Sequence, residues 1–362
     1  MESSELNLVA TIMAGGTGTR FWPMSTKNRP KQFLKLFGER SLLQKSYARI
    51  RDLLPVERVL VLTNAAHVVL VREQLPELPP GNVIGEPLKR DTAAAVGLAA
   101  ALCRRRFGNP VILTLTADHL IEPVDIFQKT LLSAAGKASE DNVLYTFGIK
   151  PDYPATGYGY LEFGQRVCQD GGIEHFELVR FKEKPDVETA KSYLSLGRFY
   201  WNSGMFVWTA DAILRELEAK LPNHYRCMTG AAASDGTPAW QKALEDAFRE
   251  VHAISIDYGV MEKAARVRAV AARFSWTDVG GWLSIEAYLP KDRAGNAFRG
   301  EIFTLDSGGN LVFCEDADEQ VMLIGLKDLV IVRTGKKTLI MKKEKAEELK
   351  NLVRALEEKE ST

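Results

Sequence analysis

The sequence is poor in the residues that build metal centres and disulfides. Its 362 residues include only 4 cysteines and 5 histidines. The cysteines form no C-x-x-C pair and the histidines no H-E-x-x-H motif. These absences exclude a zinc knuckle, a dithiol redox site and a zinc protease of that type. We expect four reduced thiols, which is the usual state in the cytoplasm.

An excess of one charge and long apolar runs are also missing. Lys plus Arg number 47 and Asp plus Glu 47, giving a formal net charge of zero. This balance argues against a nucleic-acid partner, whose phosphates attract basic surfaces. No apolar run approaches the roughly 18 residues of a membrane span, and the acidic, polar N-terminus does not resemble a signal peptide. We expect a cytoplasmic protein without a membrane partner.

The first half of the sequence alternates between strand and helix patterns. Short apolar runs predict strands at 6–13, 58–63, 82–85, 111–116 and 143–148, and helical spacing predicts helices at 41–54, 66–75, 91–107 and 124–139. Strands that alternate with helices of this length imply crossover connections and parallel pairing. We therefore predict an α/β fold with a Rossmann-like, mostly parallel sheet flanked by helices.

The middle of the sequence has a different pattern. Two strands, 158–167 and 173–182, flank Asp170-Gly171-Gly172 and predict a hairpin. The segments that follow predict a helix at 186–196, a strand at 199–208, a helix at 210–221 and a strand at 267–274. Residues 223–240 contain few apolar side chains, and we expect a loop there.

A polar, turn-rich stretch from Pro290 to Gly295 predicts a boundary, giving regions 1–289 and 290–362. The second region has short strand patterns at 310–314, 320–325, 329–334 and 337–341, followed by a helix at 345–358. We expect this β-rich region to pack on the first region or on a partner subunit, and to serve stability or assembly, not chemistry. The predicted helix carries an apolar stripe that also needs a partner: Leu349, Leu352, Val353 and Leu356. A homodimer formed through this region is our expectation.

The strongest local signal is a glycine loop, Ala14-Gly15-Gly16-Thr17-Gly18-Thr19-Arg20, directly after the first strand. Three glycines allow the backbone to approach a ligand closely, and successive amides can surround a phosphate. The loop lacks the Gly-Lys-Ser/Thr of a P-loop, and Phe21 stands at the third glycine position of a dinucleotide fingerprint. The nearby cations Arg20 and Lys31 favour phosphate binding over a turn without a ligand.

Two aspartates follow predicted strands. Asp118 comes after the strand at 111–116, and Asp278 after the strand at 267–274. Carboxylates at strand ends can share a Mg²⁺ ion, which takes one or two carboxylates together with phosphate oxygens and water. Taken alone, either aspartate could equally be a turn or cap residue.

Over about residues 6–285, these motifs resemble those of the sugar-1-phosphate nucleotidyltransferases. The family motif GGxGxRLxP, followed by PK, corresponds to residues 15–23 and 30–31, with Phe21 in place of leucine. The Phe-Trp-Pro variant is found in the branch that guanylylates mannose 1-phosphate. Other segments similar to that branch are FKEKP at 181–185, WNSGMF at 201–206, DVGGW at 278–282 and EPLKRDTA at 86–93. Asp91 and Ala94 depart from that branch, which usually has Asn and Pro there.

The resemblance implies the nucleotide-diphospho-sugar transferase fold and transfer of GMP from GTP to mannose 1-phosphate with Mg²⁺. It implies that Arg20 and Lys31 act on the phosphates and that Asp118 and Asp278 hold the metal. The nucleotide-binding residues would be Ala14, Gly15, Gly16, Gly18, Glu86, Arg90 and Thr92. The residues that bind the sugar phosphate would be Gly157, Glu183, Lys184 and Asn202. The Glu86 carboxylate could accept both N1–H and N2–H of guanine, and residues 257–262 would shape the site.

Two alternatives stay open at this point. One is a uridylyl-, thymidylyl- or adenylyltransferase that acts on glucose 1-phosphate; the Phe-Trp-Pro, Glu-Pro and WNSGMF segments favour the mannose branch over it. The other is a non-catalytic homologue that binds a sugar nucleotide without turnover. Such a homologue should have lost a cation or an aspartate of the site, whereas all of them are present here. Some relatives carry an isomerase domain with metal-binding histidines. No such cluster occurs here, so we expect a single activity.

Overall fold

The computed structural model describes residues 6–16 and 18–360. Their contacts divide the chain into two compact units, each made of several segments. Unit 1 comprises Met1–Gly15, Ser46–Ala117 and Ile121–Trp276. Unit 2 comprises Gly16–Lys45, Asp118–Leu120 and Thr277–Thr362. Because both units are discontinuous, they do not coincide with the two consecutive regions, 1–289 and 290–362, of the sequence analysis.

Unit 1 is built on a nine-stranded sheet with the order β3-β2-β1-β4-β9-β6-β10-β8-β7. Its strands are β1 (Leu8–Ala14), β2 (Val59–Asn64), β3 (Val83–Glu86), β4 (Val111–Thr116), β6 (Leu144–Ile149), β7 (Tyr160–Asp170), β8 (Ile173–Lys182), β9 (Phe199–Thr209) and β10 (Val267–Ala271). Strands β1 to β4 are parallel neighbours, as are β6 and β10, while β9 runs antiparallel between β4 and β6. The predicted mostly parallel sheet is confirmed, and β7 and β8 form the predicted hairpin. The short strands β5 (Leu120–Glu122) and β11 (Ser275–Thr277) pair separately.

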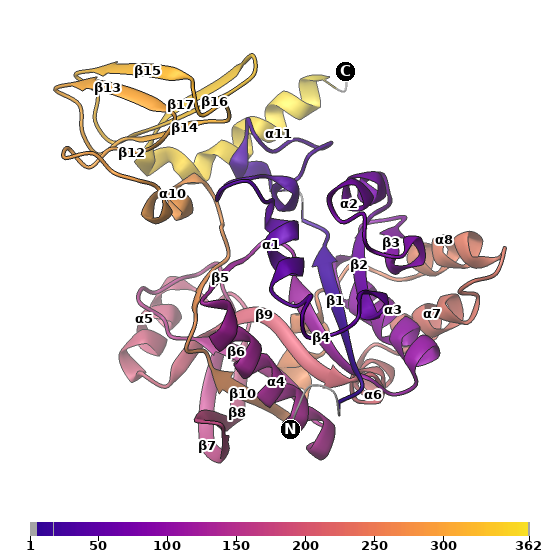
Figure 1. Ribbon diagram of the computed structural model, residues 1–362. Helices are drawn as coiled ribbons and strands as arrows, with labels where there is room; N and C mark the ends of the chain where they lie inside the picture. Colours follow the sequence, from indigo (N-terminus) through magenta and orange to yellow (C-terminus); the bar gives the residue numbers. More distant parts are fainter. Residues whose placement is uncertain (1–5, 17, 361–362) are drawn as a thin grey trace. The chain divides into compact units, whose positions relative to one another are not determined.

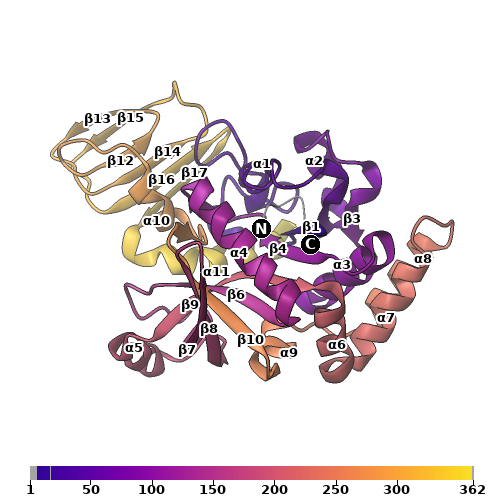
Figure 2. The same ribbon diagram turned by 60° about the horizontal axis from the view of Figure 1, so that its bottom comes forward.

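Helices cover both faces of this sheet (Figure 1). One face carries α3 (Asp91–Phe107), α6 (Ala210–Lys220), α7 (Pro222–Ala233) and α8 (Trp240–Glu250), and Figure 2 shows α6, α7 and α8 following one another along that side. Helix α4 (Val124–Asp141) lies on the other face. The remaining helices are α1 (Leu42–Ala48), α2 (Val68–Gln74), α5 (Val187–Leu196), α9 (Ile256–Gly259), α10 (Trp282–Ile285) and α11 (Leu349–Glu360). The alanines of α3 are buried, and such small side chains allow α3 to approach α6 and α7 closely.

The prediction of a loop at residues 223–240 is wrong, because α7 occupies most of that segment. The buried face of α7 includes His224, Cys227, Ala231 and Ala232, which follow helical spacing. Small and polar residues give a weak apolar signal, so this face was not recognised in the sequence. Pro222 stands at the first turn, where its missing N–H leaves no helical hydrogen bond unmade.

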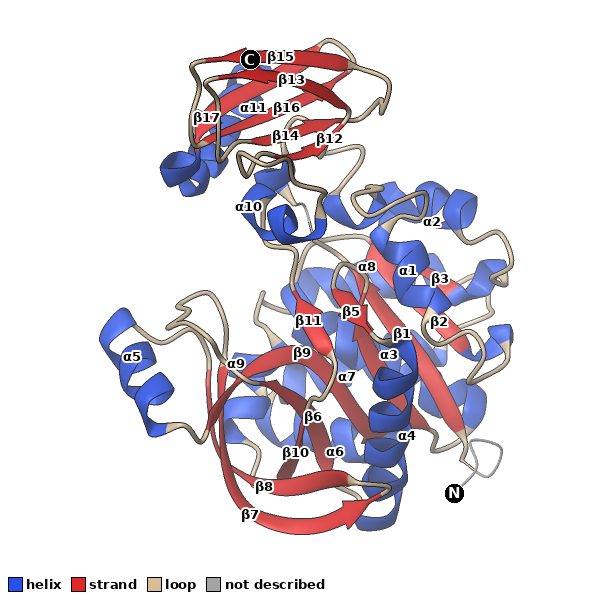
Figure 3. Ribbon diagram, turned by 60° about the vertical axis from the view of Figure 1, so that its left-hand side comes forward, coloured by secondary structure: helices blue, strands red, loops and turns tan. Residues whose placement is uncertain are grey.

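In unit 2 the C-terminal strands form stacked coils, not a simple antiparallel sheet. Strands β12 (Ala297–Arg299), β14 (Leu311–Cys314) and β16 (Leu329–Thr334) are parallel neighbours, and β17 (Lys337–Lys342) pairs antiparallel with β16. A second layer consists of β13 (Glu301–Leu305) and β15 (Gln320–Ile324), which are also parallel (Figure 3). Strands β12 and β13 were not predicted. The first two coils each contribute one short strand to each layer, whereas β16 and β17 both belong to the first layer. The coils stack through main-chain pairing.

Two buried asparagines join successive coils. The side-chain oxygen of Asn296 accepts hydrogen bonds from the backbone N–H of Asn310 at 3.0 Å and from its side-chain amide at 2.9 Å. The side-chain oxygen of Asn310 accepts in turn from the backbone N–H of Leu329 at 3.0 Å. Both asparagines are fully buried. Since buried polar groups must be paired, this ladder satisfies the turn backbone and fixes the register of the coils.

The hydrophobic core of unit 2 joins the C-terminal coils to the segment that follows the glycine loop. The Trp282 ring lies 5.1 Å, between centroids, from both the Phe21 ring and the Phe313 ring. Helix α11 adds Leu349 and Val353, which are 4% and 5% exposed. Leu352 and Leu356 are exposed, so only half of the predicted apolar stripe is covered by this chain.

Two further expectations concern membranes and thiols. No helix in the described part of the chain is both long and apolar enough to cross a membrane. All four cysteines are free thiols, and three of them are buried. Burial raises the pKa of the Cys103 thiol to about 12, so this side chain stays protonated and unreactive.

Candidate active site

Unit 2 contains a cavity of about 310 Å³ that gathers predicted site residues with both signs of charge and two glycines of the loop. The described residues that line it are Gly16, Gly18, Thr19, Arg20, Phe21, Lys31, Gln32, Asp118, Asp278, Gly280 and Lys350. We call it the phosphate pocket. Ala14 and Gly15, the first residues of the glycine loop, belong to unit 1.

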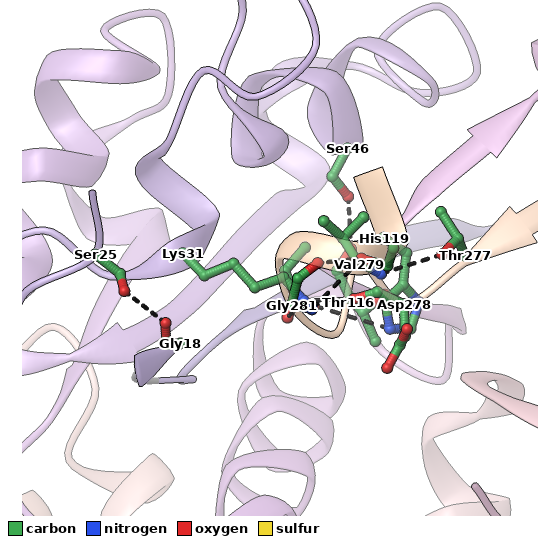
Figure 4. Close-up of polar contacts among 12 residues, drawn as sticks. Gly18, Ser25, Lys31, Ser46, Thr116, His119, Thr277, Asp278, Val279 and Gly281 are labelled. Atoms are coloured by element: carbon green, nitrogen blue, oxygen red, sulfur yellow. Dashed lines mark hydrogen bonds and ion pairs between the residues drawn. The ribbon is translucent and has the colours of Figure 1, made fainter. Parts of the chain in front are cut away.

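Lys31 contacts both aspartates of the phosphate pocket. Its Nζ lies 2.8 Å from Oδ2 of Asp118 and donates a hydrogen bond to the backbone carbonyl of Asp278. Figure 4 shows its side chain extending from its own segment toward Asp278. Burial alone would raise the pKa of Asp118, but the charges of Lys31 and His119 outweigh it and lower that pKa. Asp118 is therefore ionised at neutral pH, as a metal ligand must be.

Gly18 is required for the position of Lys31. Its φ of +61° lies in the left-handed region, and a Cβ placed on it would overlap Cβ of Lys31 and lie 2.9 Å from the backbone nitrogen of that residue. The Gly18 carbonyl accepts a hydrogen bond from the Ser25 hydroxyl at 2.6 Å (Figure 4). Any side chain at position 18 would displace Lys31, so this glycine shapes the pocket as well as leaving space for a ligand.

The segment after Asp278 packs tightly against the glycine-loop segment. Val279 has a φ of +49° and is fully buried, an unfavourable conformation for a β-branched residue. A Cβ on Gly280 would lie 3.0 Å from Oδ2 of Asp278, and one on Gly281 would lie 3.5 Å from Cβ of Arg20. The core holds Val279 in this conformation, and the two glycines leave room for the Asp278 carboxylate and for Arg20.

The side chains of the phosphate pocket that could act as metal ligands suit Mg²⁺ and not zinc. Among the described residues, no group of three or more His, Cys, Asp or Glu side chains could hold a metal ion, which argues against a zinc site. Asp118 and Asp278 nevertheless line one pocket beside the glycine loop. Mg²⁺ needs only one or two carboxylates when phosphate oxygens and water complete its shell. The residues present therefore fit the predicted Mg²⁺.

A second group of predicted residues lies at the carboxyl ends of β1 and β3 in unit 1. Glu86 is the last residue of β3, and its Oε1 lies 4.0 Å from the position of a Cβ on Gly15. Burial, followed by the charge of Asp91, raises the pKa of Glu86 to about 8. Ligands of α/β sheets bind at this edge, so the position of Glu86 suits a group that contacts the nucleotide.

Arg90 and Thr92 make contacts within the protein. Nε of Arg90 donates to the Phe248 carbonyl at 2.6 Å, and the Thr92 hydroxyl accepts from the backbone N–H of Ile256 at 2.8 Å. They hold the start of α3 against the end of α8 and the start of α9. Their predicted contact with the nucleotide stays a prediction.

The residues predicted to bind the sugar phosphate form a third group, also in unit 1. Nζ of Lys184 lies 2.6 Å from Oε1 of Glu183, and Oε2 of Glu183 lies 2.5 Å from where a Cβ on Gly159 would stand. The backbone N–H of Asn202 donates to the Gly159 carbonyl at 2.7 Å. The structure therefore brings Glu183, Lys184 and Asn202 together around Gly159. Gly157 lies in the exposed turn just before them.

Asp257 belongs to this third group, although the sequence predicts only a shaping role for residues 257–262. Its Oδ1 accepts a hydrogen bond from the Asn202 side-chain amide at 3.1 Å. Burial, followed by the nearby charge of Glu183, raises the pKa of Asp257 to about 7. Glu262, from the same segment, accepts from the backbone N–H of Glu183 at 2.8 Å. Residues 257–262 thus hold two of the predicted sugar-binding residues in place.

Lys350 is a charged residue of the phosphate pocket that the sequence did not indicate. It lies on α11, in the region expected to have no part in the chemistry. No motif marks it, because it is one lysine in a helix rich in charged residues. Only the packing of α11 beside the glycine-loop segment could have revealed it.

Two family models match consecutive parts of this chain. A family model described as nucleotidyl transferase matches residues 9–294, which is well over half of the chain. The chain belongs to the nucleotidyl transferase family. A second family model, described as the MannoseP isomerase/GMP-like beta-helix domain, matches residues 300–356, where the stacked coils lie.

Several similar proteins match this chain over nearly its whole length. A mannose-1-phosphate guanylyltransferase of Escherichia coli is 39% identical over 98% of this chain and 75% of its own length. A protein of the same name from Klebsiella pneumoniae is 39% identical over 97% of this chain and 74% of its own. A crystal structure from Thermus thermophilus, described as a mannose-1-phosphate geranyltransferase, has a TM-score of 0.85 and 32% identity, covering 97% of this chain and 100% of that one.

Proposed function

We propose that this chain transfers GMP from GTP to mannose 1-phosphate and so forms GDP-mannose and pyrophosphate. The observation that carries the reaction class is the phosphate pocket, in which Arg20 and Lys31 lie with two aspartates beside the glycine loop. The substrates are supported by the names of the relatives that match nearly the whole chain.

The proposed reaction exchanges one phosphate bond for another. An anionic phosphate oxygen of mannose 1-phosphate attacks the α-phosphorus of GTP and forms a new P–O bond. The bond from the α-phosphorus to the bridging oxygen breaks, and pyrophosphate leaves with the electron pair. Since the nucleophile is already an anion, no general base has to remove a proton. Catalysis therefore depends on positioning and on neutralising charge.

Cations of the phosphate pocket would supply that neutralisation. We assign Lys31 to the transferring phosphoryl group, where negative charge is greatest during reaction, and Arg20 to the leaving pyrophosphate. In the structure each of these two cations has a carboxylate partner: Asp118 for Lys31, and Glu347 for Arg20. These contacts hold the cations in the pocket, and phosphate oxygens would compete for them.

Asp118 and Asp278 would hold Mg²⁺ in this pocket. The ion supplies a fixed positive charge that polarises phosphate oxygens and orients the triphosphate. The protein's own contribution is to keep both aspartates beside the glycine loop. The contact with Lys31 keeps Asp118 ionised, and Val279 with Gly280 orients Asp278.

The third group would recognise mannose 1-phosphate. We assign the sugar hydroxyls to the Glu183 carboxylate and the Asn202 amide, and the phosphate to the Lys184 ammonium. A buried carboxylate discriminates strongly between sugars, because a wrongly placed hydroxyl leaves it unpaired. Glu183 is buried while Lys184 is half exposed. This difference suits a fixed hydroxyl acceptor and a more adaptable phosphate ligand.

One screen separates the proposal from the alternatives. Pyrophosphate release is measured with each of GTP, ATP, UTP and dTTP against mannose 1-phosphate and glucose 1-phosphate, with Mg²⁺. We expect the highest kcat/KM for GTP with mannose 1-phosphate. A preference for UTP, dTTP or ATP with glucose 1-phosphate would identify the first alternative. Binding of GDP-mannose without release from any pair would identify a non-catalytic homologue.

We also propose that the chain forms a homodimer through its stacked coils. The outer face of β13 and β15 exposes apolar side chains at neighbouring positions: Phe303 beside Met322, and Leu305 beside Ile324. A contiguous exposed apolar patch favours an interface, and symmetric pairs are the commonest oligomers. Light scattering should show a dimer that dissociates in a Met322→Glu, Ile324→Glu variant. A wild-type chain that is monomeric at micromolar concentration would refute the dimer.

A further inference from the structure

Helix α11 brings a cation to the phosphate pocket. Lys350, in its first turn, lines the pocket together with Arg20, Lys31 and Asp278. Its neighbours Leu349 and Val353 are buried in the core of unit 2, so the helix is held in place by its apolar side. Lys350 itself is exposed. The position of Lys350 is thus determined by packing that does not involve its own side chain.

Lys350 differs from the other two cations of the pocket. Lys31 is paired with Asp118 at 2.8 Å, and Arg20 lies 3.5 Å from Glu347. No hydrogen bond or ion pair joins the Lys350 ammonium to any other residue in the described part of the chain. A triphosphate brings several negative charges into a pocket whose two aspartates are also negative. An ammonium without a carboxylate partner is available to such a ligand without breaking an existing contact.

Glu347 adds a second link from the C-terminal region to the pocket. It lies one turn before Lys350 and contacts Arg20, and both side chains of this pair are substantially exposed. Exposed pairs of this kind contribute little to stability, typically less than about 1 kcal/mol. A phosphate group can therefore take the place of Glu347 at Arg20 at little cost.

We propose that Lys350 binds the triphosphate of the incoming nucleotide, and that Glu347 competes with that triphosphate for Arg20. The C-terminal region then contributes directly to nucleotide binding, contrary to the role expected for it from the sequence. This inference rests on the proposed function, because it identifies a further residue for the same nucleotide. Lys350 acts on binding more than on the chemical step, since its flexible, exposed side chain is not fixed toward a reacting atom.

Arg354 provides a matched control for Lys350. It lies one turn further along α11, is also exposed, and has no contact with a carboxylate among the described residues. Arg354 and Lys350 both line a larger neighbouring cavity of about 1020 Å³, but only Lys350 also lines the phosphate pocket. Glu348 is the corresponding control for Glu347, because its contact is with Lys345.

The test measures binding and kinetics separately. Titration calorimetry of the full chain with GTP and Mg²⁺, without mannose 1-phosphate, gives the Kd for the nucleotide. Lys350→Gln should raise this Kd about tenfold, the size of one lost charge-assisted contact, and Lys350→Arg should restore it. Glu347→Gln should lower the Kd about two- to threefold. Arg354→Gln and Glu348→Gln should leave it unchanged, and all variants should keep the wild-type Tm.

Steady-state kinetics provide the second readout. Lys350→Gln should raise KM for GTP by the same factor and leave KM for mannose 1-phosphate unchanged. A wild-type Kd for GTP in Lys350→Gln would overturn the inference, and so would equal weakening in Arg354→Gln, which would indicate only a general field from the helix. If the wild-type chain binds GTP but releases no pyrophosphate, the proposed function fails, while the calorimetric comparison still reports on Lys350.

Discussion

Nζ of Lys31 lies 2.8 Å from Oδ2 of Asp118, and the same ammonium donates to the backbone carbonyl of Asp278. One cation therefore contacts both residues that we assign to the metal. Lys184 also contacts a carboxylate, but it is that of the neighbouring Glu183, among the residues that we assign to the sugar phosphate. The two lysines should consequently have different kinetic roles.

Replacing each lysine by alanine should separate these roles. Lys31→Ala should lower kcat by roughly a hundredfold or more, because charge on the transferring phosphoryl group is no longer neutralised. Lys184→Ala should chiefly raise KM for mannose 1-phosphate, because that anion is bound both before and during reaction. Lys35→Ala, at an exposed lysine that contacts Glu39, is the control and should retain wild-type kinetics. The same kinetic change in both variants would contradict the division of roles.

Asp278→Asn should keep the fold but lose most of the activity. The amide is nearly the same size as the carboxylate, and the backbone carbonyl that Lys31 contacts is retained. Loss of a metal ligand should cost several kcal/mol of transition-state stabilisation, roughly a thousandfold in rate. The Mg²⁺ concentration for half-maximal activity should rise, and Tm should not fall. Turnover at the wild-type rate would remove Asp278 from the mechanism.

The affinity for GTP should rise with pH up to about 8, the pKa of Glu86. The guanine N1–H and N2–H groups donate to an ionised carboxylate, so binding below that pH must release a proton from Glu86. Calorimetry at pH 7 in buffers of different ionisation enthalpy measures this release directly. Glu86→Gln should abolish it. Asp91→Asn should shift the rise to lower pH, because the charge of Asp91 contributes to the raised pKa. A pH-independent affinity in the wild type would show that Glu86 does not accept from the base.

Asp257→Asn should stabilise the protein at alkaline pH. The folded-state pKa of Asp257 is about 7, above the value of about 3.9 in unfolded chains, so the folded state binds the extra proton. Its ionisation thus reduces the free energy of unfolding as pH rises from about 4 to 7, by up to roughly 4 kcal/mol. The amide removes this cost and retains an oxygen for Asn202. The variant should be more stable than the wild type at pH 8 and equally stable near pH 4 by denaturant unfolding.

Asp246 is a control for that measurement, because its pKa is shifted in the opposite direction to that of Asp257. Its hydrogen bond with Lys242 on the surface of α8 lowers its pKa, so the ionised form stabilises the folded state. Asp246→Asn should therefore be slightly less stable than the wild type at neutral pH and equal to it in strong acid. If Asp257→Asn behaved in the same way, Asp257 would be an ordinary paired carboxylate.

Local patterns in the sequence were sufficient for the parallel strands of unit 1 and for the helices between them, but not for α7. Each strand of the parallel sheet is an apolar run, and the helices between them have clear spacing. The stacked coils could not be predicted in this way, because the residues that pair lie far apart and at unequal intervals. Asn310 bonds to Asn296 across 14 positions, and to Leu329 across 19. Because the intervals between paired residues differ, the coils produce no recognisable repeat in the sequence. The short strand β12 gives no recognisable pattern either.

The candidate site was predicted to the extent that its residues belong to motifs. Lys31, Asp118 and Asp278 each follow a recognisable segment, and they do line one pocket. Asp257 and Lys350 belong to no motif with a known chemical role. Asp257 is distinguished by its burial, and Lys350 by the approach of a helix that is distant in the sequence. Both properties depend on tertiary packing, which a single sequence does not reveal.

The shared core of unit 2 has a consequence for the order in which the chain folds. Phe21, beside Arg20, packs on Trp282, which packs in turn on Phe313. During synthesis, the segment that carries Arg20 and Lys31 emerges early but finds these partners only when most of the chain has been made. Contacts of such long sequence separation form late, because closing the intervening loop costs entropy first. Nucleotide binding should thus be acquired at the end of folding, after the parallel sheet of unit 1 has formed, and a nascent chain would not yet retain GTP.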